Sequence, residues 1–425
     1  MKIYLHSLGC DKNLVDSEIM LGLLFEDGHK SVASPEEADA IIVNTCGFIQ
    51  SAVEEGIETI LEMASHNKKL IVTGCMAERY REEIQKEIPE VDAILGVNNF
   101  PKITQIMGSQ KVVDIDVMSD FLYEKRANTM PMHVAYIKIS EGCDNHCTYC
   151  TIPSIRGKYR ERSQASILKE CARLVAGGAR ELVLVAQDTA CYTNLPNLLS
   201  KMAKIEDLGW IRLMYAYPEH ITDELIEVIA SEEKICNYID MPIQHSHDNV
   251  IARMARKSTN MGLSNLIAKL QEKNIAIRTT LIAGFPGETE EEYAHLCNFI
   301  EETRFDHLGV FEYSQEDGTP AAEMKHQVDA QVKTARQEQL MAIQAVIADE
   351  KVKSFVGQTL KVMVDGSVGM EDELIAYSGR SQRDAYETDG AVFFSSPVEW
   401  MSGDFVQVKI TKAQGYDMYG ELVSA

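Results

Sequence analysis

The sequence predicts an α/β protein in three parts: a parallel-sheet domain, an open barrel of six strand–helix units and a small all-β barrel. From residue 2 to about residue 355, apolar runs of strand length alternate with amphipathic runs of helix length, which is the pattern of parallel sheets covered by helices. From residue 358 the helical runs stop and five short alternating strands follow, which is typical of a closed β-barrel. The expected domains are residues 1–115, 129–357 and 358–425.

The first part is expected to form a parallel sheet of flavodoxin-like size. Its expected strands are residues 2–6, 40–45, 70–73 and 93–95, and its expected helices are residues 16–25, 52–65 and 77–88. Cys10, Cys46 and Cys75 come just after the first three of these strands. Because the carboxyl ends of parallel strands meet at one edge of a sheet, where open α/β folds bind ligands, we expect the three thiols to converge there.

These three thiols are expected to hold an iron–sulfur cluster. Thiolate ligands without histidine favour such clusters over hard metal ions. The alternative is that the cysteines pack as small apolar residues, but a packing role would place them within the strands and not beyond their ends. Three ligands leave one iron of a four-iron cluster without a protein ligand.

The second part is expected to be an open parallel barrel. Its expected strands are residues 134–139, 182–186, 211–217, 238–243, 277–283 and 308–313, with helices that include residues 164–176, 223–229, 260–273 and 290–302. The run CDNHCTYC follows the first strand, which places Cys143, Cys147 and Cys150 on the rim at the carboxyl ends of the strands. This triad predicts another four-iron cluster with one open iron. A zinc knuckle or three buried cysteines are the alternatives, but zinc requires a fourth ligand, and the nearby His146 lies inside the run.

The third part follows a long amphipathic helix at residues 329–355. Its expected strands are residues 359–364, 374–377, 391–394, 405–410 and 418–423. Residues 358–425 hold five basic and eleven acidic side chains, and the whole chain of 425 residues has a net charge of −24. Such a surface repels the phosphates of a nucleic acid and attracts a basic protein. The charge therefore favours a basic protein partner over RNA.

The composition also bears on the compartment. The N-terminal run MKIYLHSLGC has no basic segment followed by a long apolar one, and no apolar stretch of about 20 residues occurs, so no membrane partner is expected. Ten cysteines without a secretory signal indicate a reducing compartment. We expect a cytoplasmic protein.

Taken together, the motifs resemble the radical S-adenosylmethionine (SAM) methylthiotransferase family. The spacing CxxxCxxC, with Tyr149 before the last cysteine, is similar to the radical SAM signature, in which SAM chelates the open iron. GCDKNLVDSE, NTCGFI and TGCM around the first triad are similar to the N-terminal motifs of this family, and YSGRSQRD and GDFVQVKI resemble its C-terminal TRAM domain. The resemblance implies a transferase with two [4Fe-4S] clusters, and SAM as both radical source and methyl donor.

The resemblance also implies where SAM binds. The rim segments 186–192, 241–248, 283–289 and 313–320 stand where the family has its SAM and substrate cavity. Tyr149 is expected near the adenine, and Gln187 and Gly284 are expected to contact SAM. The densest basic run consists of Arg156, Lys158, Arg160 and Arg162. It is either a solvated loop or a source of cations for the carboxylate of SAM or of an aspartate substrate.

The first motif discriminates within the family. Lys12, Asn13, Val15 and Asp16 resemble the branch that modifies a ribosomal protein, whereas the tRNA-modifying branch usually has a Gln-Met-Asn run at that place. Asp11 is a departure, because proline is commoner there. The resemblance implies methylthio insertion at the β-carbon of an aspartate in ribosomal protein S-twelve, with electrons from a low-potential donor of flavodoxin or ferredoxin type. A tRNA methylthiotransferase and a noncatalytic iron–sulfur assembly factor are the alternatives.

Overall fold

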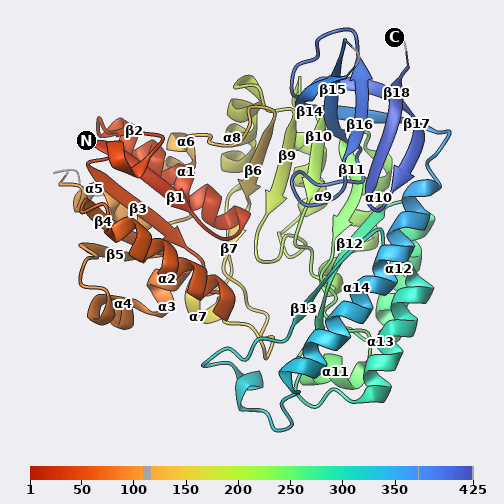
Figure 1. Ribbon diagram of the computed structural model, residues 1–425, viewed down its shortest axis with the longest axis horizontal. Helices are drawn as coiled ribbons and strands as arrows, with labels where there is room; N and C mark the ends of the chain where they lie inside the picture. Colours follow the sequence, from red (N-terminus) through yellow and green to blue (C-terminus); the bar gives the residue numbers. More distant parts are fainter. Residues whose placement is uncertain (109–115, 372, 424–425) are drawn as a thin grey trace.

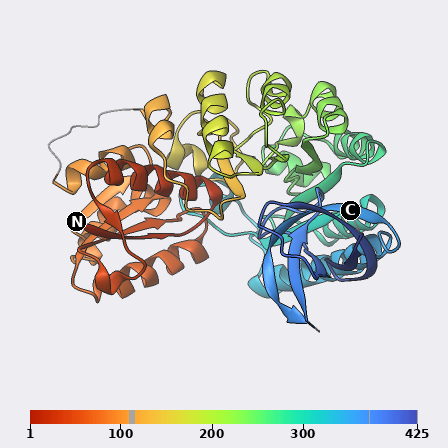
Figure 2. The same ribbon diagram turned by 90° about the horizontal axis from the view of Figure 1, so that it is seen from above.

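The computed structural model describes residues 1–108, 116–371 and 373–423, and it contains the three expected parts (Figure 1). The N-terminal sheet lies beside the open barrel, and the C-terminal barrel packs against the opposite part of it (Figures 1 and 2). The predicted fold class is confirmed. The predicted domain boundaries stay predictions, and residues 109–115 at the first of them lie outside the described residues.

The N-terminal sheet is parallel throughout and has the strand order β2-β1-β3-β4-β5, the flavodoxin-like order. Its strands are β1 (Lys2–Ser7), β2 (Lys30–Ser31), β3 (Ala40–Thr45), β4 (Lys69–Gly74) and β5 (Ala93–Gly96). Four of them match the expected strands. The prediction missed β2, because a two-residue exposed edge strand has no apolar pattern.

Helices cover both faces of this sheet. They are α1 (Asp11–Glu26), α2 (Gln50–Ala64), α3 (Cys75–Arg79), α4 (Arg81–Glu87) and α5 (Ile103–Ile106). Side chains that alternate along each strand divide the core: Ile42 and Ile71 pack with α1, whereas Ile41 and Val72 pack with α2 and α3. Two predicted helices differ from those observed. The first begins five residues earlier, at Asp11, and the expected helix 77–88 is divided into α3 and α4 at Tyr80.

The central sheet has six parallel strands in the order β13-β12-β11-β10-β9-β6 and is open between its two edges. They are β6 (Val134–Lys138), β9 (Glu181–Val185), β10 (Trp210–Leu213), β11 (Ile235–Asp240), β12 (Ala276–Ala283) and β13 (His307–Glu312). The helices on its outer face are α8 (Gln164–Ala176), α9 (Leu195–Met202), α10 (Asp223–Ser231), α12 (Asn260–Glu272), α13 (Glu290–Thr303) and α14 (Ala330–Lys353). The expected open (β/α)6 barrel is therefore confirmed.

Short elements surround the cysteine loop of this barrel. The two-stranded ribbon of β7 (Ser140–Glu141) and β8 (Arg160–Glu161) flanks the loop, which leads into α7 (Ile152–Arg156). Two further short helices are α6 (Asp120–Lys125) and α11 (Asp248–Arg253). The ribbon closes the base of the loop, so the three cysteines between its strands project from a fixed stem.

The C-terminal part is a closed barrel with the strand order β14-β15-β16-β18-β17. Its strands are β14 (Thr359–Glu371), β15 (Leu374–Arg380), β16 (Val392–Ser396), β17 (Phe405–Gln414) and β18 (Asp417–Leu422). All five expected strands are present, and β14 extends seven residues beyond its predicted end at residue 364. The barrel encloses apolar side chains such as Val362, Tyr377 and Val408.

The C-terminal barrel covers the amino ends of the central strands. Glu181, at the start of β9, is fully buried and accepts a 2.6 Å hydrogen bond from Arg212 of β10. Its other oxygen lies 2.7 Å from Nη1 of Arg380 on β15. The rings of Trp210 and Phe405 meet edge to face with centroids 5.1 Å apart. A buried charge and an aromatic contact thus join the two barrels.

None of the helices in the described part of the chain has both the length and the apolar content that crossing a lipid bilayer requires.

Replacing Glu181 by Gln should destabilise the protein, because it leaves the buried Arg212 and Arg380 without their shared carboxylate. We expect the free energy of unfolding to fall by about 3–5 kcal/mol in chemical denaturation near neutral pH. As a control, Glu87→Gln removes an exposed pair with Lys86 and should cost less than about 1 kcal/mol.

The same variant has a pH signature. Burial alone would raise the pKa of Glu181, but the guanidinium groups of Arg380 and Arg212 bring that pKa below its usual range. The carboxylate therefore stabilises the fold above the unfolded-state pKa of about 4.3, and this contribution is lost as the pH falls through the folded-state pKa. The difference between wild type and Glu181→Gln should shrink in acid, and a pH-independent difference would contradict this account.

Candidate functional site

Both cysteine triads line one cavity between the edge of the N-terminal sheet and the rim of the central barrel. Its volume is about 310 Å³. Other residues on its wall include Lys12, Phe48, Tyr149, Gln187, Tyr215 and Arg256. The structure therefore brings together six cysteines that the sequence places in two separate domains.

The first triad comes from three adjacent strands, as expected. Cys10 follows β1 and precedes α1, Cys46 follows β3, and Cys75 is the first residue of α3 after β4. Gly74 allows the tight turn before Cys75, because its φ is +99° and a Cβ there would lie 2.3 Å from the carbonyl oxygen of Thr45. The loops thus approach one another more closely than side chains would permit.

Asn13 ties these loops together. Its Nδ2 donates to the carbonyl oxygens of Leu8, at 3.2 Å, and Thr45, at 3.0 Å. Its Oδ1 lies 3.6 Å from the Sγ of Cys75 and also accepts a hydrogen bond from Arg156. One side chain therefore fixes the positions of all three loops that carry the first triad.

The second triad lies on the loop between β7 and α7. The backbone N–H of Asn145 points at the Sγ of Cys143, with 3.4 Å between nitrogen and sulfur, and the Tyr217 hydroxyl lies 3.5 Å from the Sγ of Cys147. Burial raises the pKa of the Cys150 thiol to about 12. Burial likewise raises the pKa of the Cys75 thiol to about 12, although the Arg156 guanidinium opposes this shift. Each of these thiols would have to lose its proton to serve as a thiolate ligand.

The spacing of the thiols suits a cluster better than a single ion. Among the described residues, the one group of three metal-binding side chains whose ligand atoms lie within 4.8 Å of one another is Asp188, Cys191 and His220. Neither triad is that compact, and a single zinc ion would need such spacing. Wider thiolate triads fit the larger [4Fe-4S] cluster, so the residues present fit the group that the sequence predicts.

The group around Asp188 has a different role. Its Oδ1 accepts 3.3 Å hydrogen bonds from the backbone N–H groups of Cys191 and Tyr217. Its Oδ2 lies 3.2 Å from Nδ2 of Asn145 and 2.7 Å from Nδ1 of His220. All four acceptor positions of the carboxylate are used. Asp188 therefore orients two residues that contact cysteine sulfurs, and it has no lone pair left for a metal.

Two of the three predicted SAM contacts line the cavity. Tyr149 packs edge to face on Phe285, and its hydroxyl lies 3.3 Å from Nη1 of Arg256. Gln187 donates a 2.8 Å hydrogen bond to Glu141, while its buried Oε1 has no partner among the described residues. That free acceptor is available to a ligand with N–H donors.

Gly284 lies elsewhere. It is not among the described residues that form the cavity wall, and a Cβ there would come within 2.2 Å of the Cγ of Lys333. Close packing against α14 accounts for this glycine, whose φ is +73°. A contact between Gly284 and SAM stays a prediction.

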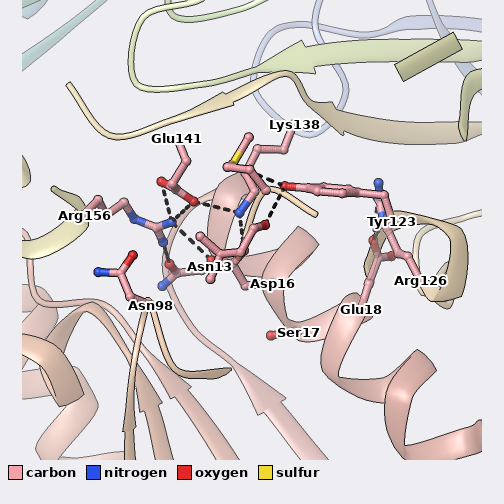
Figure 3. Close-up of polar contacts among 12 residues, drawn as sticks. Asn13, Asp16, Ser17, Glu18, Asn98, Tyr123, Arg126, Lys138, Glu141 and Arg156 are labelled. Carbon is pink, nitrogen blue, oxygen red and sulfur yellow. Dashed lines mark hydrogen bonds and ion pairs between the residues drawn. The ribbon is translucent and has the colours of Figure 1, made fainter. Parts of the chain in front are cut away.

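A buried ion network joins the two domains beside the cavity (Figure 3). Asp16 of α1 pairs with Lys138 of β6. Glu141 lies 2.7 Å from Lys138 Nζ and 2.9 Å from Arg156 Nη1, and Arg156 also lies 3.1 Å from Asp16. Burial alone would raise the pKa of Glu141, but Arg156 and Lys138 hold it well below its usual range. Two acidic and two basic side chains thus pair with one another in the buried contact between the domains.

A second set of ion pairs extends this network. Arg126 donates to Glu18 of α1 at 2.7 Å and to Glu170 of α8 at 2.8 Å. Glu170 in turn accepts a 2.6 Å hydrogen bond from Arg162. Of the basic run that follows the second triad, Arg156 and Arg162 are therefore structural ion-pair partners, whereas Lys158 is exposed.

The sequence prediction missed several cavity residues, including Tyr215, Tyr217 and Arg256. Tyr215 and Tyr217 stand just beyond β10, at the rim that holds the second triad. Residues just after a barrel strand lie on the rim, so their position could have identified them as cavity residues. The sequence prediction extends this strand to residue 217 and therefore places both tyrosines inside it, whereas the strand ends at Leu213.

Comparison with family models agrees with this division of the chain. Residues 2–96 match the uncharacterized protein family UPF0004, residues 137–300 match the radical SAM superfamily, and residues 356–423 match the TRAM domain.

The chain is also similar over its whole length to curated proteins. It is 48% identical over 441 residues to ribosomal protein uS12 methylthiotransferase RimO of Lachnoclostridium phytofermentans, with 99% of each chain covered. It is 44% identical over 443 residues to the protein of the same name from Clostridioides difficile, covering 100% of this chain and 99% of that protein.

Solved structures support the fold. The radical SAM methyltransferase TsrM from Kitasatospora setae has a TM-score of 0.51 and 13% identity, covering 87% of this chain and 79% of that chain. The cobalamin-dependent radical SAM enzyme OxsB has a TM-score of 0.52 and 11% identity, covering 80% and 56%. At these identities the likeness concerns the fold alone.

The central barrel and its cysteine loop define a radical SAM enzyme, which uses SAM and a [4Fe-4S] cluster. The chain belongs to the RimO family of ribosomal protein uS12 methylthiotransferases, as its full-length identity of 43–48% to curated members shows.

Tyr217→Phe should lower the midpoint potential of a cluster held by Cys147, because the hydroxyl lies 3.5 Å from that sulfur. A hydrogen bond to a ligand sulfur stabilises the more negative, reduced cluster. The potential is read by electron paramagnetic resonance during a redox titration. Tyr293→Phe removes a hydroxyl that hydrogen-bonds to Arg336 and Gln339 of α14 and is not part of the cavity wall in the described structure, so it should leave the potential unchanged. Equal potentials in wild type and Tyr217→Phe would show that this hydroxyl does not reach the cluster ligand.

Proposed function

We propose that the protein inserts a methylthio group at the β-carbon of an aspartate in ribosomal protein uS12. The observation that carries the proposal is the single cavity lined by cysteine triads from two domains. Membership of the RimO family supports the same reaction. A saturated carbon is not acidic enough for ordinary base catalysis, so its hydrogen must leave as an atom and sulfur must be delivered to the same place. A shared cavity meets both needs.

In this proposal Cys143, Cys147 and Cys150 hold the cluster that binds SAM, and Cys10, Cys46 and Cys75 hold a second [4Fe-4S] cluster. When bound, the first cluster would supply an electron for the cleavage of SAM, and the second would supply sulfur for the methylthio group. SAM would serve both as radical source and as methyl donor. Three cysteine ligands would leave one iron of each cluster available to such exogenous groups.

The side chains around the SAM cluster would orient SAM. The Nε2 of Gln187 donates a hydrogen bond to Glu141, which fixes the orientation of the Gln187 amide group. The free Oε1 of the same amide is therefore suited to accept a hydrogen bond from a ligand. Tyr149 is held between Phe285 and Arg256 and presents a fixed aromatic surface to the cavity. The adenine would lie against that surface.

Apolar residues on the cavity wall would limit the water around the reacting atoms. Phe48, Ile152 and Pro242 contribute this apolar surface. The ion network behind that wall holds the sheet edge against the barrel rim, since Asp16 and Lys138 come from different domains. A fixed gap between the triads lets the substrate carbon face both without moving between sites.

The substrate partner would be uS12, as a free protein or in the small subunit. A net charge of −24 favours a basic partner. We also propose a low-potential electron donor of flavodoxin or ferredoxin type, because the reaction consumes electrons, and a cytoplasmic location, where ribosomal proteins are. The tRNA reaction of MiaB-type enzymes is the alternative, and the acidic C-terminal barrel argues against it. The noncatalytic alternative does not agree with membership of an enzyme family.

Replacing each triad by Ala should separate the two halves of the reaction. The reconstituted wild type should carry about eight irons, and either triple variant should carry about half of them. The Cys143, Cys147 and Cys150 variant should lose SAM cleavage, whereas the Cys10, Cys46 and Cys75 variant should keep some 5′-deoxyadenosine formation and yield no methylthio product. Iron analysis and product chromatography measure both. Sulfur insertion by the second variant would make its cysteines structural.

A competition tests the substrate. The holoenzyme, SAM and a reductant are mixed with uS12 and a tRNA anticodon stem-loop in one vessel, and mass spectrometry reads both products. We expect methylthio on the protein, and faster association with uS12 at low salt, because the complementary charges are screened within about 8 Å at physiological ionic strength. Modification of the RNA alone would overturn the proposal in favour of the MiaB reaction.

A further inference from the structure

Lys12 is a buried cation on the wall of the shared cavity. It is the second residue of α1, two positions after Cys10, and only 8% of it is exposed. Its Nζ lies 3.2 Å from the centroid of the Tyr215 ring. Across the described residues, no carboxylate lies within 4.0 Å of Nζ and no hydrogen-bond acceptor contacts it. Most of the Lys12 side chain is buried, and its ammonium group faces the cavity without a counter-ion among these residues, so this site favours an anionic ligand.

The other two cations on the cavity wall already have partners. Arg156 is held by Asp16, Glu141 and Asn13. Arg256 donates to the carbonyl oxygen of Pro242 at 3.0 Å and to the Tyr149 hydroxyl at 3.3 Å. Arg256 therefore belongs to the side of the cavity that holds the second triad, whereas Lys12 is on the side of the first.

Tyr215 binds the carboxylate of Asp11, the residue that precedes Lys12. The Tyr215 hydroxyl donates a 2.9 Å hydrogen bond to Oδ2 of Asp11, and its ring lies against the Lys12 ammonium group. Its backbone has a φ of +60°, an unusual conformation for a large side chain. The tyrosine thus separates two adjacent residues of opposite charge, and it leaves the cation facing the cavity without its neighbour's neutralising charge.

We propose that Lys12 binds the side-chain carboxylate of the substrate aspartate through its Nζ, an inference that rests on the proposed function. In an aspartate the carboxylate carbon is bonded directly to the β-carbon. A carboxylate held at Lys12 therefore keeps the β-carbon beside Cys10 and the first triad, on the side of the cavity from which sulfur would come. Lys12 is then a specificity residue that selects an acidic side chain over an amide.

The test measures the binding of two substrates to four forms of the enzyme. The holoenzyme with both clusters is titrated with uS12 and with uS12 in which the modified aspartate is replaced by Asn, and Kd is measured by calorimetry. Lys12→Met is compared with wild type, because methionine has a similar length and no charge. Lys12→Arg restores the charge, and Lys30→Met removes one charge from an exposed lysine of β2 as the control for net charge.

Wild type and Lys30→Met should bind uS12 at least about tenfold more tightly than its Asn form, the magnitude of a charged hydrogen bond. Lys12→Met should bind both forms with the same, weaker affinity, and Lys12→Arg should recover most of the preference. A Lys12→Met protein that still prefers the aspartate by tenfold would overturn the inference and shift the role to Arg256. If Lys12→Met loses iron, Lys12→Gln takes its place in the same cycle.

The outcomes separate this inference from the proposed function. Failure of the wild type to methylthiolate uS12 would overturn the proposed function and, with it, the role of Lys12. Methylthiolation by the wild type, combined with an unchanged aspartate preference in the lysine variant, would overturn the role of Lys12 alone. The wild type could also bind both substrate forms with equal affinity, and Lys12→Met could lose affinity equally for both. That result would overturn the inference and show that Lys12 only packs against Tyr215.

Discussion

The buried ion network of Asp16, Lys138, Glu141 and Arg156 is the interaction on which the site depends. Burying acidic and basic side chains is costly, and here each of them lies at short range from a partner of opposite charge. Asp16 comes from the sheet domain and the other three from the barrel. The network therefore has its full complement of partners only when the two domains are docked in one arrangement, which makes that arrangement specific.

The positions of the cysteines follow from this docking. Arg156 contacts Asn13, and Asn13 holds the loops of the first triad through Leu8 and Thr45. On the other side of the network, Glu141 accepts the hydrogen bond from Gln187 beside the second triad. A continuous path of polar contacts thus links the sheet edge to the barrel rim. Each contact restricts the next, so the separation of the triads is set by directional bonds as well as by the apolar core.

Much of this could be predicted from the sequence. Apolar periodicity located nearly all the strands, and cysteines beyond strand ends indicated a common edge, because both features depend on local patterns. The ion network could not be predicted in the same way: Asp16 and Arg156 are 140 positions apart, and nothing local to either residue identifies its partner. For the same reason Arg156 was a candidate for ligand binding in the sequence and is an ion-pair partner in the structure. The prediction missed Tyr215 as a cavity residue because it placed the end of β10 four residues too late.

The place of the C-terminal barrel has a consequence for how such a chain can diversify. It sits at Glu181 and Trp210, where the central strands begin, whereas the thiols lie where those strands end. A strand of five residues puts about 15 Å between these two positions. Substitutions on the outer surface of the C-terminal barrel can therefore accumulate without changing the cavity wall. The two regions lie at opposite ends of the same central strands and can diverge independently.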